Sequence, residues 1–108
     1  MFFITSKYLV PKGFSGLTVF PFVFFRKRSL RADATFVNHE KIHIRQQLEL
    51  LVVLFFVWYL LEFLVRLMQT RNRYQGYRRI SFEREAYENE KDPDYLNARS
   101  FWRFLKYL

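Results

Sequence analysis

The chain has 108 residues, no cysteine and a formal net charge of +8 at pH 7, and 21% of its residues are aromatic. A chain of this length can build one small core, so residues 1–108 are expected to form a single minimal domain and a two-domain enzyme is excluded. The lack of cysteine excludes disulfide bonds, thiolate metal sites and a cysteine nucleophile, so any metal must be bound through nitrogen or oxygen.

High aromatic content combined with positive charge is typical of proteins that lie on or in an anionic membrane. A nucleic-acid-binding groove has a similar composition, but its aromatic residues alternate with basic ones. Here the aromatic residues cluster in unbroken apolar runs. We therefore expect anionic membrane lipids as partners and do not expect nucleic acid.

The first 25 residues predict a β-hairpin. Residues 2–10 are β-branched and aromatic, residues 11–16 are typical of a turn, and residues 17–25 are apolar again. Pro21 would interrupt a central strand, so the second arm is expected at an edge or as an irregular segment. Alternatively this arm dips into a bilayer, although it is too short to span one as a helix. Residues 1–11 lack the small-residue cleavage site of a signal peptide and are expected to belong to the fold.

A basic run, residues 26–31, follows the second arm. In a soluble protein such a run is usually a solvated loop, and beside so many phenylalanines its alternative role is contact with lipid phosphates. Asp33 or Thr35 is predicted to cap the N-terminus of the next helix, because either side chain can accept hydrogen bonds from unpaired amides of the first turn.

This helix carries the motif HExxH at residues 39–43, which contains both histidines of the chain. Side chains four residues apart project from one face of a helix, so His39 and His43 can bind a single Zn²⁺ through their ring nitrogens. Glu40 lies beside the metal, where it can take a proton from a zinc-activated water and pass it to a leaving amine. The alternative is a chance match on a charged, solvated helix face.

No glycine or proline occurs from Glu40 to Gly76, so one long helix is expected to continue through Leu67. Its middle, residues 50–61, is apolar all round, which requires burial in protein or in lipid. Residues 48–68 would be long enough to cross a bilayer. Both flanks are basic, however, which favours a tilted or in-plane helix as much as a span.

The remaining chain predicts two shorter helices. Gly76 is expected to end or bend the long helix, and Ser81 to cap a second helix over residues 82 to about 91. Pro93 is expected at the first position of a third helix that runs to residue 108 and packs mainly on the core. The predicted fold class is therefore α+β, mainly α, with an N-terminal β-hairpin.

Catalytic zinc needs three protein ligands and one open position. With no further histidine or cysteine, the third ligand must be a carboxylate, and residues 82–88 are the richest place to look. Glu49 is the competitor on the motif helix itself, but it lies about 240° around that helix from His43 and faces away from the metal.

This combination resembles the gluzincin metallopeptidases, particularly the membrane-embedded HtpX-type heat-shock proteases and the sensor-protease domains of antibiotic receptors. Those families pair HExxH with a glutamate in an ExxAD-like pattern on a later helix. The resemblance covers residues 38 to about 91 and implies Glu83 as the third ligand, with Ala86 allowing close helix approach. Tyr87 stands where the aspartate is expected, so the carboxylate that usually orients a metal-bound histidine is missing or replaced. Glu85 remains the alternative ligand, since only one of the two glutamates can face the site.

The resemblance implies a zincin-like domain that hydrolyses peptide bonds of a peptide or protein substrate at or near a membrane. Tyr87, or a nearby arginine, is then expected to stabilise the oxyanion of the tetrahedral intermediate. The string NHEKIH followed by RQQ is also similar to strings in small bacterial proteins, which favours a bacterial cell membrane. The alternative is a non-catalytic subunit of a larger membrane complex, packed against a membrane-protein partner or a homo-oligomer.

Overall fold

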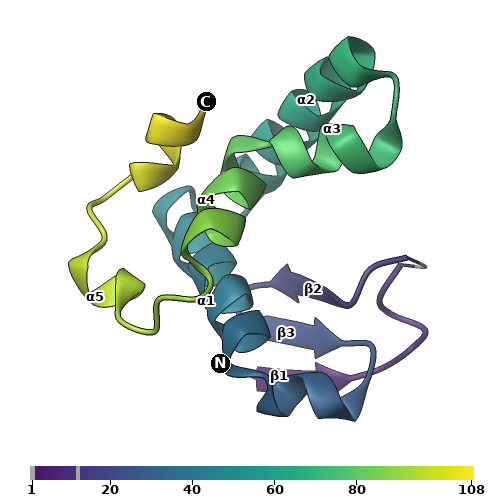
Figure 1. Ribbon diagram of the computed structural model, residues 1–108, viewed down its shortest axis with the longest axis vertical. Helices are drawn as coiled ribbons and strands as arrows, with labels where there is room; N and C mark the ends of the chain where they lie inside the picture. The colour runs from purple at the N-terminus through teal and green to yellow at the C-terminus, as the bar shows by residue number, and fades with distance from the viewer. Residues whose placement is uncertain (1, 12) are drawn as a thin grey trace.

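The computed structural model describes residues 2–11 and 13–108. Met1 and Lys12, the second of which belongs to the predicted turn, lie outside the described residues. The fold is α+β and mainly helical, as predicted, with a small sheet formed by the N-terminal part of the chain. Figure 1 shows this sheet at the lower right of the central helix α1, with α2 and α3 above it and α5 and the C-terminal segment on the left.

The sheet has three strands, β1 (Phe2–Thr5), β2 (Gly16–Val19) and β3 (Phe22–Phe25), in the order β1-β3-β2. The antiparallel hairpin joins β2 to β3 within the second predicted arm, and β1 pairs in parallel with β3. Pro21 is the reason: it lies in the turn between β2 and β3, where its missing N–H removes no bond from the sheet. The two predicted arms therefore pair in parallel through β1 and β3 and form no hairpin with each other. Of the second arm, β2 is an edge strand as expected, whereas β3 lies at the centre of the sheet.

The sheet packs on α1 through a small apolar cluster of Val23, Phe25 and Ile44. Arg26, the first residue of the basic run, donates from Nη2 to the backbone oxygen of Val10 at 2.8 Å and from Nε to that of Phe14 at 2.9 Å. These bonds tie the chain between β1 and β2 to the end of β3. Arg26 thus has a structural role instead of the predicted solvated or lipid-facing one.

A short 3-10 helix, η1 (Arg28–Ala32), leads into α1 (Ala34–Glu49). The Asp33 carboxylate accepts hydrogen bonds from the amides of Thr35 and Phe36 at 3.1 and 3.2 Å. Asp33, one of the two predicted caps, is therefore the N-cap, because its side chain satisfies two amides that have no partner within the helix.

The long helical run predicted through Leu67 is present as two helices, α1 and α2 (Val53–Thr70). Between them Leu51 and Val52 both have φ of 57°, in the left-handed region that non-glycine residues rarely adopt. Such a backbone costs roughly 1–3 kcal/mol per residue, so tertiary packing must hold it. The break lets α2 turn back to pack on later helices.

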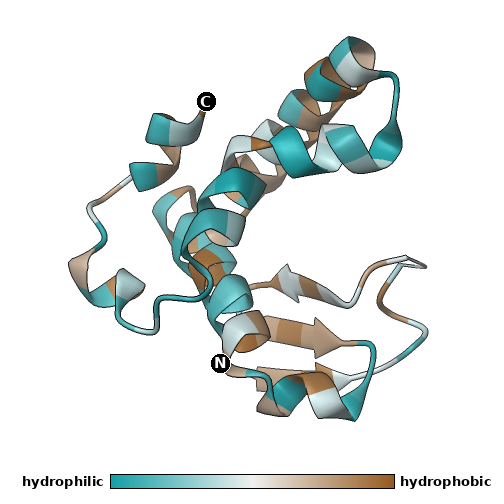
Figure 2. Cartoon of the chain, viewed as in Figure 1, coloured by the Kyte–Doolittle hydropathy of each residue, from teal (hydrophilic) through white to brown (hydrophobic). Residues whose placement is uncertain are grey.

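Helix α2 contributes its inward side to the main core, which contains Leu50, Phe55, Ile80, Phe82 and Phe104. It is also long and apolar enough to cross a membrane by length and composition, with a mean hydropathy of 1.5, although only 11% of its residues are buried. Figure 2 shows hydrophobic residues on the strands and along α2, and hydrophilic ones along α3 and α4. The apolar residues of α2 are thus only partly used by the core.

Helix α3 (Arg73–Arg79) folds back along the C-terminal end of α2. The chain turns at Arg71, which has φ of 56°, and Asn72 caps α3 by accepting from the Gln75 amide at 3.0 Å. The prediction that Gly76 ends or bends the helix was wrong. Gly76 lies inside α3, where an added Cβ would stand 3.1 Å from the Leu67 nitrogen, so glycine is needed for the close approach of the two helices.

Helix α4 (Ser81–Asn89) begins one residue earlier than predicted, with Ile80 and not Ser81 at the N-cap position. Ser81 is fully buried, and its amide and hydroxyl donate to the Glu62 carboxylate at 3.0 and 2.7 Å. The Glu62 carboxylate of α2 therefore accepts from the first amide of α4, in place of the capping by the Ser81 side chain that the sequence predicted. This contact fixes the start of α4 against α2.

The C-terminal part forms two short helices, α5 (Tyr95–Ala98) and η2 (Arg103–Tyr107), instead of the predicted continuous helix from Pro93. Arg99 lies between them and is only 8% exposed, because its guanidinium pairs with the carboxylates of Glu49 and Glu85. The amide of Trp102 also donates to Glu49. These polar contacts pull the chain out of helical geometry and secure it across α1 and α4.

Candidate metal centre

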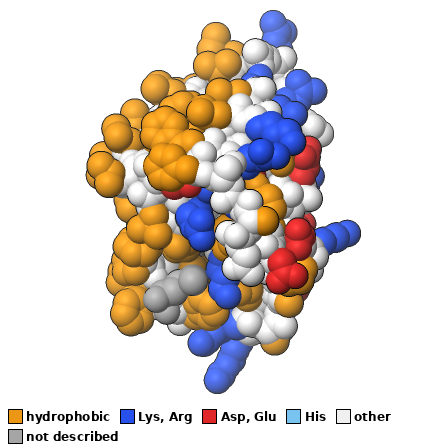
Figure 3. Space-filling model, turned by 90° about the vertical axis from the view of Figure 1, so that its left-hand side faces the viewer, with side chains coloured by type: hydrophobic (Ala, Val, Ile, Leu, Met, Phe, Trp, Pro, Cys, Tyr) orange, Lys and Arg blue, Asp and Glu red, His pale blue; other side chains and the backbone are white. Residues whose placement is uncertain are grey.

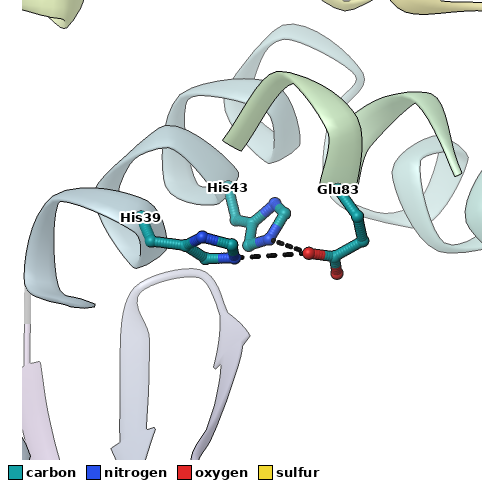
Figure 4. A group of neighbouring side chains, drawn as sticks. All are labelled: His39, His43 and Glu83. Atoms are coloured by element: carbon teal, nitrogen blue, oxygen red, sulfur yellow. Dashed lines mark hydrogen bonds and ion pairs between the residues drawn. The ribbon is translucent and has the colours of Figure 1, made fainter. Parts of the chain in front are cut away.

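The two histidines of the motif lie one turn apart on α1 and are nearly fully buried, at 4% exposure for His39 and 6% for His43. Their ring centroids are 4.9 Å apart. Figure 4 shows both rings pointing toward a side chain that comes from α4, Glu83. The helical spacing thus brings the two rings to one point, as predicted.

Glu83 completes the group. Its Oε1 atom lies 3.3 Å from Nε2 of His39 and 3.0 Å from Nε2 of His43. One nitrogen from each ring and one carboxylate oxygen all lie within 4.8 Å of one another, and all three residues are buried. Ala86, fully buried on the same helix, takes little room between α4 and its neighbours. These three side chains could hold a metal ion.

The charges of the group fit a cation. Burial opposes ionisation of Glu83, but the two imidazoles beside it outweigh that effect and hold the pKa of its carboxyl well below the usual range. Burial likewise lowers the pKa of His43, but the adjacent Glu83 carboxylate raises it to about 9 overall. The buried carboxylate is thus stabilised by positive charge where the two rings meet, which a protonated His43 or a bound cation could supply.

Glu40 lies next to this group on the wall of a cavity of about 210 Å³ that His39, His43 and Glu83 also line. The carboxylate is 6% exposed and accepts a hydrogen bond from the hydroxyl of Thr18 in β2. Burial raises the pKa of Glu40, and His43, His39 and the Thr18 hydroxyl only partly oppose the rise. A carboxylate with a raised pKa, placed beside a metal-binding group, is suited to accept a proton.

Both histidines have a second partner at Nδ1. Glu90 lies just past the end of α4 and places Oε2 2.7 Å from Nδ1 of His39, while Gln46 places Oε1 2.8 Å from Nδ1 of His43. Each partner can accept the Nδ1 proton, which leaves Nε2 of each ring free to bind a metal.

Glu90 replaces the orienting carboxylate that was expected at Tyr87. It follows Glu83 by seven residues, about 700° of helix and so close to the same face. That spacing is a signal that the sequence contained. Tyr87 instead packs its ring against His39, with centroids 4.5 Å apart, and pairs its hydroxyl with that of Tyr77 at 2.7 Å.

Glu85, the alternative third ligand, is occupied elsewhere. It is fully buried, accepts from Nη2 of Arg99 at 3.1 Å and from the Tyr95 hydroxyl at 2.6 Å, and also binds Gln46. These groups hold the pKa of its carboxyl below the usual value despite burial. Glu49 likewise pairs with Arg99, at 2.7 Å, and takes no part in the group, as predicted.

Two tyrosines line the same cavity, Tyr59 from α2 and Tyr77 from α3. The Tyr59 hydroxyl donates to Oε2 of Glu83 at 2.7 Å, which holds the carboxylate so that its other oxygen faces the rings. Burial, followed by the nearby Glu83 carboxylate, raises the pKa of both phenols far above the usual range, so both keep their protons and remain donors. Sequence reasoning missed both residues, because their helices meet the site only through tertiary packing.

The rest of the cavity wall is mainly apolar, apart from Gln47 of α1. The apolar side chains come from the segment before β2, from β2 itself and from α2: Pro11, Phe14, Leu17, Phe55 and Phe56. No protein-family model matches the chain, and no curated protein or solved structure matches it either.

Proposed function

We propose that the chain is a zinc-dependent metallopeptidase that hydrolyses peptide bonds of a peptide or protein substrate at or near a membrane. The observation that carries the proposal is the position of Glu83 Oε1, within 3.3 Å of Nε2 of both histidines, with Glu40 on the wall of the same cavity. Two imidazoles and one carboxylate are a ligand set that catalytic zinc sites use, with one coordination position left for water or substrate.

In this proposal His39, His43 and Glu83 hold Zn²⁺. When bound, zinc supplies Lewis-acid chemistry, lowering the pKa of a water molecule and polarising the peptide carbonyl. Glu90 and Gln46 fix the orientation of the two rings through their Nδ1 atoms. Because these contacts keep Nε2 of both rings directed at the same point, the protein prepares the metal site before any ligand arrives.

Glu40 is the proposed general base and acid. It takes a proton from the attacking water as the new C–O bond forms, and returns it to the amine nitrogen as the C–N bond breaks. The Thr18 hydroxyl holds its carboxylate against β2. The phenol of Tyr77, which keeps its proton and lines the cavity, is the proposed donor to the developing oxyanion, with Tyr87 acting through its contact with Tyr77. The single proton of Tyr59 is already donated to Glu83.

The test compares Glu40→Gln with Glu88→Gln, a substitution of an exposed glutamate on α4. The proposal predicts that zinc-loaded wild type and Glu88→Gln cleave members of a quenched peptide library, whereas Glu40→Gln keeps its zinc and loses roughly 10²–10⁴-fold in rate. Cleavage by Glu40→Gln at the wild-type rate would remove the proposed role of that residue.

The second candidate is a non-catalytic subunit of a membrane complex. Its support is the outward side of α2, where eight large apolar side chains are at least 45% exposed. In this case the histidines and Glu83 serve structure or hold a metal without chemistry. Zinc-loaded wild type that cleaves no peptide, together with a stable partner recovered in gentle detergent, would favour this candidate over the peptidase.

A further inference from the structure

Helix α2 has the reverse of the polarity expected for a helix on the surface of a soluble domain. Its two charged residues, Glu62 and Arg66, lie on the inward side, where Glu62 is 8% exposed and bonded to Ser81. The exposed side carries no charged residue at all. It consists of Val53 71%, Leu54 56%, Val57 52%, Leu60 56%, Leu61 59%, Leu64 45%, Val65 51% and Met68 78%, with Gln69 at its C-terminal end.

This apolar face of α2 continues onto the C-terminal segment. A shallow hollow of about 580 Å³ is lined by residues of α2 together with Leu50, Trp102 and Leu108. Its lining includes Glu62 and Arg66, so the two charged residues of α2 border the apolar face where the helix meets the C-terminal segment. A contiguous apolar surface of this kind is unusual on a protein that stays in water, and it marks a surface that something covers.

The charges beside the face favour one kind of cover. Arg103 and Lys106 are exposed on η2 next to Leu108, and the whole chain carries +8. Figure 3 shows hydrophobic side chains gathered along one edge of the molecule, with lysines and arginines running beside them. A second copy would bring the same positive charge against the first, whereas an anionic lipid surface offers both apolar depth and opposite charge.

We propose that the apolar face of α2 inserts into the interface of an anionic bilayer, with the helix lying in the membrane plane. The surroundings of α2 decide between this orientation and a span. Its inward side is covered by the core through Phe55 and by α3 through the close contact of Gly76 with Leu67. If α2 spanned the bilayer, the core residues and α3 packed on its inward side would have to enter the hydrocarbon interior of the membrane.

Three exposed arginines of α3, Arg73, Arg78 and Arg79, would then be taken into the membrane interior. Charged side chains at that depth are strongly disfavoured. With α2 in the membrane plane the same arginines stay in water or at the headgroups, and the eight exposed apolar side chains of α2 face the acyl region. The structure therefore supports the in-plane choice that the sequence left open.

The first test measures binding of the zinc-loaded 108-residue chain to vesicles of phosphatidylcholine with or without about 30% phosphatidylglycerol. The proposal predicts strong co-sedimentation with the anionic vesicles, reduced at least tenfold in the double variant Leu61→Gln/Val65→Gln. Leu9→Gln is the matched control, because Leu9 is 55% exposed on the segment between β1 and β2. Equal binding of the double variant and wild type, or absence of wild-type binding, overturns the proposal.

The second test measures depth. Because the chain has no cysteine, single variants Leu54→Cys, Leu61→Cys and Met68→Cys can each carry a nitroxide label. These positions span about 21 Å along one side of the helix. The in-plane orientation predicts the same depth for all three labels from oxygen and nickel-chelate accessibility.

A difference in depth of many ångströms along the series shows a span and overturns the proposal. The proposal is also overturned if, without lipid, all three labels are protected from oxygen and the nickel chelate and the chain sediments as a dimer. Zinc content is measured on every variant, since neither test requires the peptidase to be active. Lipid binding without zinc contradicts only the proposed function, and zinc without lipid binding contradicts only this inference.

Discussion

Glu90 places its carboxylate oxygen Oε2 2.7 Å from Nδ1 of His39, on the opposite side of the ring from the nitrogen that faces Glu83. We expect Glu90→Ala to lower zinc affinity about 10–100-fold without abolishing it, because the ring loses the group that fixes its orientation. Glu90→Gln should recover part of the loss, since its amide oxygen can still accept the Nδ1 proton. Competition against a chelator of known affinity measures both, with Glu88→Ala as control. Unchanged affinity in Glu90→Ala would exclude the orienting role.

Glu83 and Glu85 are two residues apart but have different expected phenotypes. Glu83→Gln should show no detectable zinc binding, because it removes the negatively charged ligand between the two rings. Glu85→Gln should bind zinc as wild type does but be less stable by about 1–3 kcal/mol, because the buried Arg99 loses a charged acceptor. Zinc titration and denaturant unfolding separate the two effects. Zinc binding by Glu83→Gln with loss in Glu85→Gln would reverse the assignment.

Zinc binding should depend on pH through His43, whose pKa in the metal-free protein is raised to about 9 by Glu83 despite the opposing effect of burial. Below that pH a proton occupies the ring and zinc must displace it, so apparent affinity should rise roughly tenfold per pH unit between pH 6.5 and 8.5. Calorimetry in buffers of different ionisation enthalpy should show about one proton released at pH 7.5. A flat affinity over this range would contradict the contact.

The same pair affects the stability of the metal-free chain. A raised folded-state pKa means that the folded protein holds a proton that the unfolded chain releases above about pH 6.5. The contribution of His43 is therefore fully present below pH 6.5 and is lost as pH rises through about 9. The free energy of unfolding of the metal-free chain should fall over this interval, and saturating zinc should remove the fall.

Glu62 is expected to be important for stability and not for the metal. Glu62→Ala leaves the buried amide and hydroxyl of Ser81 without their acceptor, so we expect a loss of about 1–3 kcal/mol in the free energy of unfolding. Denaturant unfolding measures it, with the exposed Glu88→Ala as control. An unfolding free energy equal to that of the control would show that the capping contact contributes nothing.

The elements that sequence predicted well are those whose signals are local. The helical spacing of His39 and His43 is enough to bring their rings together, and the acidic pattern after Ser81 predicted a helix that carries both Glu83 and Glu85. Asp33 was recognisable as a cap for the same reason. In each case a few neighbouring residues fix the geometry. The choice of Glu83 as the residue that faces the rings came from the resemblance and not from the local acidic pattern.

What sequence missed depends on contacts between distant segments. The break at Leu51 and Val52 carries no glycine or proline, and it exists because packing of α2 holds two residues at φ of 57°. Tyr59 lies on α2, after this break, and donates to Glu83 across the packed helices. The C-terminal helix is interrupted because Arg99 is drawn to carboxylates 14 and 50 residues away in sequence.

Elemental analysis of purified chain, beside His43→Ala, tests the metal centre most directly. We expect about one equivalent of zinc per wild-type chain, and little or none in His43→Ala, whose circular dichroism should still show the helical content of the wild type. Wild-type protein that is folded, has been exposed to excess zinc and still holds none after removal of free metal would contradict the account.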